Sequence, residues 1–352
     1  MKISFYPEST QQNKYSEIIT SLLKSKGVKI YSLSYIFSGL AAFRKVKVVH
    51  LNWYENLNEP TRWAVFSVFF KRILKLIVLR LFGKKVIWTM HNKIPHDKSM
   101  MFYKKAILYM LVKLSNTIII HSRVSELILR DISTGSVSKV RYIPHPDYIG
   151  VYGDIDLSSD HTTETRVLNL LFLGAVKPYK NIELLIDVIS QFDHDVFLTI
   201  AGQPQNEDYH RLLENYAKDN DNVHLDLKFI PDEELPAYIA KCDLLVMPYD
   251  MRSSLNSGSV ILAFSYKKTV ICPRIGTILD MQNQENILSY TYNTDLEHFD
   301  ALTDVIGRAI EMKKTSAGVF KAYGELIYED VAVQNNKDKV IRLLMAEYDR
   351  FV

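Results

Sequence analysis

Two short segments in the second half of the chain combine cations, hydroxyls and small residues, as anion sites do. The first, FLGAVKPYKN, places Gly174, Lys177 and Lys180 between an apolar run and a helix-like stretch. Two ammonium groups beside the start of a helix can hold a diphosphate and stabilise it as a leaving group. The alternative is a pair of exposed lysines on a loop, and the motif alone does not decide between the two.

The second segment is the serine-rich stretch that follows the apolar run LLVMPY. Ser257, Gly258 and Ser259 stand where a helix begins, so their amides lack partners within the helix. Small residues let an anion approach these amides, and the helix dipole favours negative charge. A plain Ser N-cap on a crossover helix is the alternative. We predict that both segments together form a diphosphate site.

The segment TMHNKIPHD in the first half is the other candidate for chemistry. His91 follows an apolar run, and Asp97 lies in the same loop. A histidine titrates near neutral pH, so it can accept a proton from a hydroxyl or stabilise a nearby charge. Asp97 can act as a rival base or orient an imidazole. A histidine at a strand end often serves only as a structural hydrogen-bonding residue; we expect this of His121 and leave His50 and His145 open.

Apolar strands alternate with helix-length segments, which is the pattern of a parallel sheet covered on both faces. In the first half we expect strands at 3–6, 28–33, 46–53, 85–90, 117–121 and 140–143. In the second half we expect them at 168–173, 196–201, 223–229, 244–248 and 269–272. Ligands of such sheets bind beyond the carboxyl ends of the strands, where the candidate residues lie.

The sequence therefore predicts an α/β protein with two Rossmann-like domains that face each other across a cleft. The polar, glycine-containing stretch 150–166 is the best linker. We assign 1–155 to an N-terminal domain and 165–330 to a C-terminal domain that carries both predicted diphosphate-binding segments. We expect residues 331–352 to form a helix that crosses back to the first domain.

Composition restricts the class of protein. The chain has 352 residues, 47% of them hydrophobic and 24% charged, with a net charge of +3, as in an ordinary globular protein. Its two cysteines lie in apolar sequence, which predicts buried, reduced thiols. A signal peptide, an apolar run long enough to span a bilayer and a metal-ligand spacing are all missing from the sequence. We expect a cytoplasmic protein without a metal, another cofactor or a nucleic-acid partner.

A basic and aromatic stretch, 62–85, lies between the third and fourth strands and holds no acidic residue. Such a helix can lie in a membrane interface with its cations near anionic headgroups. On a helical wheel Lys71, Arg72 and Lys75 share one side. The alternative is a crossover helix whose cations extend past the apolar surface. Because the stretch 100–114 repeats the pattern, we favour peripheral contact with the cytoplasmic membrane through both.

Taken together, LGAVKPYKN, AGQP, FIPDEELPAYIAKCDLLVMPY and the serine loop resemble the nucleotide-sugar-binding half of GT-B glycosyltransferases. The resemblance is to the large family-four group that builds bacterial surface polysaccharides. It implies that Lys180, with Lys177 as a shifted partner, holds the donor diphosphate. It implies a nucleobase site at Gly202, Phe229 and Ile230. TMHN resembles the family's strand-end T-x-H, whose histidine faces the reacting sugar.

One departure from the family pattern concerns the donor sugar. The family commonly carries two glutamates eight residues apart, and the matching positions here hold Ser254 and Leu262. The sugar hydroxyls must then be held by other groups. Our candidates are Asp250, Arg252, Ser254 and Asn256. The departure leaves the donor sugar and the retaining or inverting outcome open.

The sequence thus predicts a metal-independent glycosyltransferase. It would move a sugar from a nucleotide diphosphate sugar to a saccharide acceptor, most plausibly lipid-linked, in capsule, exopolysaccharide or O-antigen synthesis. The base, UDP or GDP, and the oligomeric state stay open. Two rivals are a catalytically decayed subunit that binds nucleotide sugars and a sugar-nucleotide epimerase or phosphorylase. An epimerase would need paired carboxylate bases, which the missing glutamates disfavour.

Overall fold

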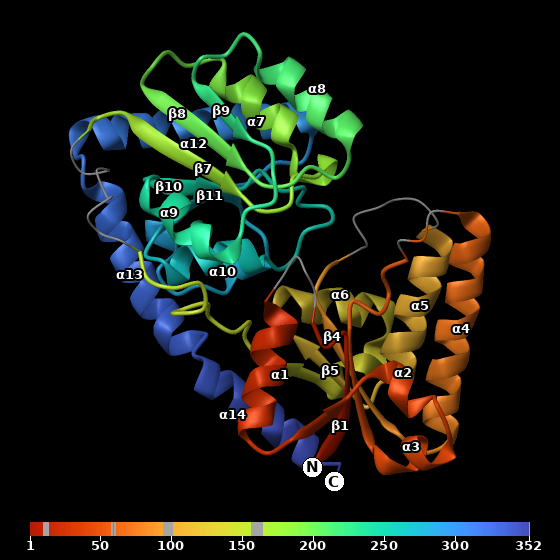
Figure 1. The fold of residues 1–352 in the computed structure, drawn as a ribbon. Helices are drawn as coiled ribbons and strands as arrows, with labels where there is room; N and C mark the ends of the chain where they lie inside the picture. The colour runs from red at the N-terminus through yellow and green to blue at the C-terminus, as the bar shows by residue number, and fades with distance from the viewer. Residues whose placement is uncertain (10–13, 58, 60, 94–100, 156–164, 352) are drawn as a thin grey trace. The chain divides into compact units, whose positions relative to one another are not determined.

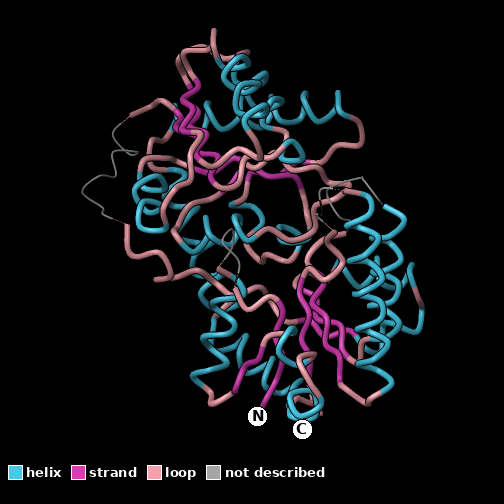
Figure 2. Tube along the Cα trace, turned by 45° about the vertical axis from the view of Figure 1, so that its right-hand side comes forward, coloured by secondary structure: helices cyan, strands magenta, loops and turns pink. Residues whose placement is uncertain are grey.

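The computed structural model describes residues 1–9, 14–57, 59, 61–93, 101–155 and 165–351, which form two compact units. Each unit is a parallel sheet with helices on its faces (Figures 1 and 2). The first unit consists of Met1–Pro146, Arg252–Asn256 and Asn335–Val352, and the second of Asp147–Met251 and Ser257–Gln334.

The first unit is built on a six-stranded parallel sheet of order β2-β1-β3-β4-β5-β6. Its strands are β1 (Lys2–Tyr6), β2 (Lys29–Tyr31), β3 (Val48–Asn52), β4 (Lys85–Met90), β5 (Thr117–Ile120) and β6 (Val140–Tyr142). The sequences VVHLN of β3 and TIII of β5 are buried at every position. Because both faces of these strands are covered, they are almost continuously apolar in sequence.

Helices cover both faces of this sheet. One face carries α1 (Tyr15–Ser25) and α14 (Lys337–Asp349), which bury Leu23 and Leu344 against β1 and β3. The other face carries α2 (Leu33–Ile36), α3 (Leu40–Lys45), α4 (Arg62–Leu81), α5 (Met101–Leu114), α6 (Val124–Ile132) and the 3-10 turn η1 (Thr134–Lys139). Asn335–Val352, which includes α14, belongs to the first unit, whereas residues 331–334 of the stretch expected to return belong to the second.

Helix α4 corrects one expectation about the basic face. Arg72 points inward, where its guanidinium donates to the carbonyl oxygens of Tyr54 (2.6 Å) and Asn56 (2.5 Å). Lys75 is half-buried over the ring of Phe37. A helical wheel cannot show which side packs on the sheet, so it grouped Arg72 and Lys75 with the exposed Lys71.

The second unit has a six-stranded parallel sheet of order β12-β11-β10-β7-β8-β9. Its strands are β7 (Leu168–Leu173), β8 (Val196–Ala201), β9 (Val223–Asp226), β10 (Leu244–Val246), β11 (Val270–Pro273) and β12 (Leu288–Tyr290). With β7 as the first strand, this is the Rossmann order 3-2-1-4-5-6. The sequence analysis missed β12, a three-residue edge strand, and made β9 too long at its carboxyl end.

One face of the second sheet packs on α7 (Ile182–Ile189), α8 (Glu207–Ala217) and α12 (Asp295–Thr315). Helices α9 (Leu235–Ala240) and α10 (Gly258–Ser265) lie on the other side of the sheet (Figure 1). The remaining elements are α11 (Gly276–Leu279), α13 (Val319–Gln334) and the 3-10 turns η3 (Pro178–Lys180), η4 (Asp232–Glu234) and η5 (Gln284–Asn286).

The boundary between the units lies earlier than the linker composition indicated. Residues 147–155 belong to the second unit, because the amide of Tyr148 donates to Ser265 Oγ (2.9 Å) and that of Tyr152 to the Tyr266 hydroxyl (3.0 Å). Most of the expected linker, 156–164, lies outside the described residues. These long-range bonds to α10 have no signature in local composition.

A buried ion pair fastens α12 to the amino ends of β7 and β10. Lys313 Nζ lies 2.7 Å from Asp243 Oδ1, and the two side chains are 0% and 2% exposed. Asp243 Oδ2 also accepts the amide of Asn169 at 2.8 Å. The attraction between the two charges compensates for the hydration that each loses on burial.

Removing one member of this pair will destabilise the second unit. We expect Lys313→Met to lower the free energy of unfolding by about 3 kcal/mol, because it leaves a buried carboxylate without its cation. Urea denaturation measures this loss. The double variant Lys313→Met/Asp243→Asn removes both charges and should recover part of the stability; a single variant as stable as the unaltered protein would contradict the argument.

Candidate functional site: an anion site at the carboxyl ends of β7 and β10

The strand order of the second sheet reverses between β7 and β10, and ligands of Rossmann sheets bind at such a point. The loop after β7 carries Gly174, Lys177 and Lys180. The loop after β10 leads to the amino end of α10. The sheet order therefore brings the two predicted diphosphate-binding segments to one edge.

Lys180 is the central charged group at this edge. It is only 8% exposed, and its Nζ lies over the rings of Phe172 (5.3 Å) and Tyr249 (5.9 Å). Within the described part of the chain it forms no ion pair. Burial, with a smaller contribution from the charge of Lys177, lowers the pKa of Lys180 to about 8. A buried ammonium group without a carboxylate partner favours the binding of an anion.

Gly174 brings the lysine loop close to α10. Its φ of +126° is a conformation that side chains rarely adopt. A methyl group placed on Gly174 would lie 3.6 Å from Lys180 Nζ and 3.8 Å from Ser259 Oγ. The ammonium group and the first turn of α10 therefore adjoin the same small space. Lys177 is half-buried, and burial lowers its pKa as well.

The first turn of α10 presents free amides. Ser257 is the N-cap: its Oγ accepts the amide of Val260 (3.2 Å) and bonds with the Tyr249 hydroxyl (3.0 Å). The hydroxyl of Ser257 is thus used within the protein. The amides of Gly258 and Ser259 have no acceptor among the described residues. Two free amides and the positive end of the helix dipole complete a site for an anion.

The predicted nucleobase residues separate into different roles. Gly202 has φ +148°, and a Cβ there would lie 1.9 Å from the carbonyl oxygen of Gly174. Gly202 thus permits the close packing of two strand-end loops. Phe229 is 60% exposed and Ile230 is buried, so the two do not form one flat surface. Both lie in the loop between β9 and η4.

The predicted donor-sugar residues are divided between the two units. Asp250 remains in the second unit, whereas Arg252, Ser254 and Asn256 belong to the first. Leu255 between them is fully buried in the first unit's core, and Asn256 Nδ2 donates to the carbonyl oxygen of His91 (3.0 Å). Sequence could not show this, because the partner of Asn256 is 165 residues away.

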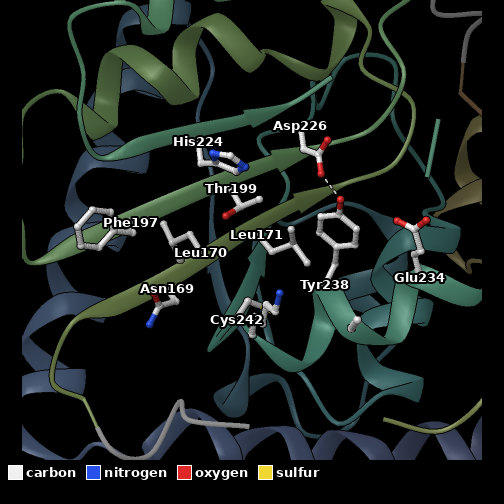
Figure 3. Close-up of a pocket in the computed structure, with 12 residues that line it drawn as sticks. Asn169, Leu170, Leu171, Phe197, Thr199, His224, Asp226, Glu234, Tyr238 and Cys242 are labelled. Atoms are coloured by element: carbon white, nitrogen blue, oxygen red, sulfur yellow. Dashed lines mark hydrogen bonds between the residues drawn. The ribbon is translucent and has the colours of Figure 1, made fainter. Parts of the chain in front are cut away.

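A pocket of about 450 Å³ lies elsewhere in the second unit, on a face of β7, β8 and β9 beside α9 (Figure 3). Phe197, Thr199 and His224 line its sheet side, and the Tyr238 hydroxyl donates to Asp226 Oδ2 at its rim. The pocket contains none of the predicted site residues. We therefore assign the anion site to the strand ends and not to this pocket.

His91 follows β4 in the first unit and is surrounded by aromatic rings. The Trp53 indole stacks on its imidazole with centroids 4.0 Å apart, and the Tyr15 ring meets it edge-on at 5.0 Å. Burial, together with His121, His145 and His50, lowers the pKa of His91 well below its usual value. The ring is therefore neutral near pH 7, which favours a hydrogen-bonding role over proton transfer. Asp97, the rival base, lies outside the described residues.

Two of the other histidines are structural. His121 Nδ1 donates to the carbonyl oxygen of Ile143 (2.7 Å), and its Nε2 meets the Tyr15 hydroxyl (3.1 Å). His50 contacts Thr89 Oγ1 (2.7 Å) and the Tyr348 hydroxyl (2.5 Å) through its two nitrogens. Both use all their hydrogen-bonding capacity inside the fold, as expected for His121.

The sequence analysis missed three residues that shape these sites. Tyr249 holds the N-cap and lies beneath Lys180, and Thr277 Oγ1 accepts the amide of Ser257 (2.9 Å). Asn52 bonds with His91 in the first unit. Asn52 ends β3 and Tyr249 follows the end of β10, so the rule that ligands bind beyond strand ends could have found them; Thr277 has no such signal.

Across the described residues no three His, Cys, Asp or Glu side chains gather where they could hold a metal ion. Among the described helices, none combines the length and the apolar character needed to cross a bilayer.

Two parallel-sheet units, with a candidate anion site at the switch point of the second, are the arrangement of the GT-B fold. Solved structures share this fold over nearly the whole chain. Anabaena Alr3699/HepE in complex with UDP aligns with a TM-score of 0.73 at 13% identity, covering 99% of this chain and 100% of that one. Sucrose-phosphate synthase from Thermosynechococcus elongatus gives 0.74 at 14% identity, with coverages of 99% and 98%.

Sequence comparison relates part of the chain to one family and to a named relative. Residues 157–306 match the family described as Glycosyl transferases group 1. The GDP-mannose:glycolipid 4-beta-D-mannosyltransferase of Xanthomonas campestris pv. campestris is 28% identical over 237 residues, 66% of this chain and 63% of that protein. The match therefore spans less than two thirds of that relative's length. The match over residues 157–306 and the Xanthomonas relative support the resemblance to group 1 glycosyltransferases, and the solved structures show the GT-B fold.

The pKa of Lys180 gives the anion site a defined pH dependence. The ammonium form predominates below pH 8 and is lost above it. We expect the affinity for GDP or UDP, measured by calorimetry, to fall on the order of tenfold between pH 7.5 and 9. Lys180→Ala should bind weakly with little change over this range. A pH dependence that persists unchanged in the variant would contradict the assignment.

Proposed function

We propose that this chain transfers a sugar from a nucleoside diphosphate sugar to a saccharide acceptor carried on a lipid. In this proposal the second unit binds the donor, and Lys180, Lys177 and the amides of Gly258 and Ser259 neutralise the departing diphosphate. The first unit binds the acceptor, and His91 contacts a sugar hydroxyl.

The observation that carries this proposal is the buried ammonium group of Lys180 beside the free first turn of α10. A charge in this position lowers stability unless an anion compensates it. The lysines and amides can supply the positive charge that a developing diphosphate needs, so we propose that transfer does not require a divalent cation. Activity that survives an excess of chelator would support this part.

The relatives suggest which substrates to test first. The Xanthomonas relative is named for GDP-mannose and a glycolipid, and the Anabaena structure contains UDP. We propose GDP-mannose as the first donor to test and UDP-glucose as the second. A glycolipid is the corresponding acceptor, and synthesis of a surface polysaccharide is the proposed pathway.

Replacing Lys180 should test the donor site directly. We expect Lys180→Ala to lower kcat/KM by a factor of about 30 to 1,000, because a lost charge-assisted phosphate contact costs about 2–4 kcal/mol in the transition state. Radiolabelled sugar transfer measures the loss. Lys218→Ala, an exposed lysine at the end of α8, is the matched control and should be fully active.

The same assay separates the rival functions. A decayed binding subunit would bind the nucleotide in calorimetry but neither transfer nor hydrolyse the sugar. An epimerase would convert the nucleotide sugar without an acceptor. Full activity of Lys180→Ala would remove the lysine from the mechanism even if transfer is observed.

We further propose that the first unit binds the cytoplasmic membrane surface through α4 and α5, which pack side by side (Figure 1). The outer face of α4 exposes a stripe of large apolar side chains at helical spacing: Trp63, Phe66, Phe70, Leu74, Ile77 and Leu81. Trp63 is 81% and Leu81 78% exposed. A monomeric water-exposed surface rarely carries so continuous an apolar stripe.

Cations border this stripe. Arg62, Lys71 and Arg80 are exposed on α4, and α5 exposes Phe102, Lys105 and Tyr109 on one side. Neither helix contains an acidic residue. Apolar groups flanked by cations fit an anionic lipid surface, where the side chains insert and the cations stay at the headgroups.

Liposome flotation tests this surface. We expect binding to vesicles with anionic lipid and a loss of roughly tenfold or more in Arg62→Glu/Lys71→Glu/Lys105→Glu, since each cation contributes about 1 kcal/mol. Phe70→Ser/Leu74→Ser should also weaken binding without unfolding the protein, because both side chains are exposed. Lys24→Glu/Lys26→Glu on the opposite face of the first sheet is the control. Equal flotation of all variants would exclude this surface.

A further inference from the structure

Asn52 lies at the carboxyl end of β3, fully buried beside His91. Its Nδ2 donates to the carbonyl oxygen of Tyr6 (3.2 Å). A carbonyl oxygen only accepts, so this bond fixes which end of the amide is which. Asn52 Oδ1 must then be the atom that faces His91 Nε2, at 3.1 Å.

The same reasoning fixes the proton of His91. An amide oxygen only accepts, so His91 Nε2 carries the hydrogen and donates it to Asn52. In the neutral ring, the lone pair is then on Nδ1. Nδ1 has no hydrogen-bond partner among the described residues, and His91 as a whole is 5% exposed. His50 and His121 differ, because both of their nitrogens are bonded.

Other contacts hold the ring and the backbone of His91 in place. Trp53 covers one ring face and Tyr15 meets it edge-on. Asn256 Nδ2 holds the carbonyl oxygen of His91 at 3.0 Å. The groups that titrate nearby are Tyr15 and the neutral histidines 50, 121 and 145, so no carboxylate is described against the ring.

We propose that Asn52 is a positioning residue that keeps the His91 proton on Nε2 and so presents Nδ1 as the acceptor for a sugar hydroxyl. This inference rests on the proposed transfer reaction for its functional part. Its structural part is that neutral His91 has a single tautomer, and this can be measured whether or not the protein transfers a sugar. An amide is suited to this task because, unlike a carboxylate, it fixes the tautomer without favouring the imidazolium form.

The first experiment measures the tautomer. Long-range nitrogen–proton NMR on the protein labelled with 15N-histidine, with the His91 signals assigned by their loss in His91→Gln, should show the proton on Nε2 from pH 6 to 8. The ligand-free protein suffices, so this measurement does not depend on the proposed function. A proton on Nδ1 would overturn the inference.

The second experiment uses two substitutions of Asn52. Asn52→Leu removes the acceptor and should lower kcat about tenfold or more, with the KM for the donor unchanged. Asn52→Asp places a carboxylate against Nε2, which raises the pKa of His91. Its kcat should therefore fall as the pH drops from 8 to 6, whereas the kcat of the unaltered protein stays level.

Asn206→Asp provides the matched control, because an aspartate also serves as the N-cap of α8. It should keep the original pH profile. An Asn52→Asp profile identical to that of the unaltered protein would overturn the inference. If the unaltered protein showed no transfer with any donor, the proposed function would fail, while the tautomer measurement would still decide the position of the proton.

Discussion

A positive charge is buried at the switch point of the second sheet, and much of that unit is arranged around it. Lys180 lies on the rings of Phe172 and Tyr249, without a carboxylate among the described residues. Gly174 and Gly202 allow the strand-end loops to approach closely. Ser257 and Thr277 fix the start of α10, leaving two amides directed away from the helix. The described residues place no carboxylate beside the Lys180 ammonium group, so a bound ligand can supply the compensating negative charge.

The strand ends of the first unit are arranged around neutral imidazole rings instead of a buried charge. Histidines, the Tyr15 ring and the Trp53 indole gather at these strand ends, where burial keeps the imidazoles neutral. Neutral rings can serve as directional hydrogen-bonding groups only if their protons are placed by neighbours. The carbonyl oxygens of Tyr6 and Ile143 do this: they accept hydrogen bonds from Asn52 Nδ2 and His121 Nδ1. The orientation of the site thus depends on the backbone of the sheet.

Sequence reasoning was strongest where a signal is local. The central strands were found because burial on both faces makes them continuously apolar, and Lys180 became a candidate from its place after such a strand. It failed where a side chain's partner is distant in the chain. Asn256 looks like a residue of the serine loop until its bond to His91 is seen, and Arg72 looks exposed until its bond to Tyr54 is seen. Short edge elements such as β12 have too few residues to form a pattern.

The segment Arg252–Asn256 packs in the first unit, to which its neighbours in sequence do not belong. Leu255 within this segment lies in the first unit's core, although the chain before Arg252 and after Asn256 belongs to the second unit. If recombination exchanged the second half of the chain as one block, the segment Arg252–Asn256 would have to pack in the core of a first unit with a different sequence. Exchange of such halves is therefore constrained. Either both halves change together, or the exchanged loop must acquire side chains that fit the core of the new first unit.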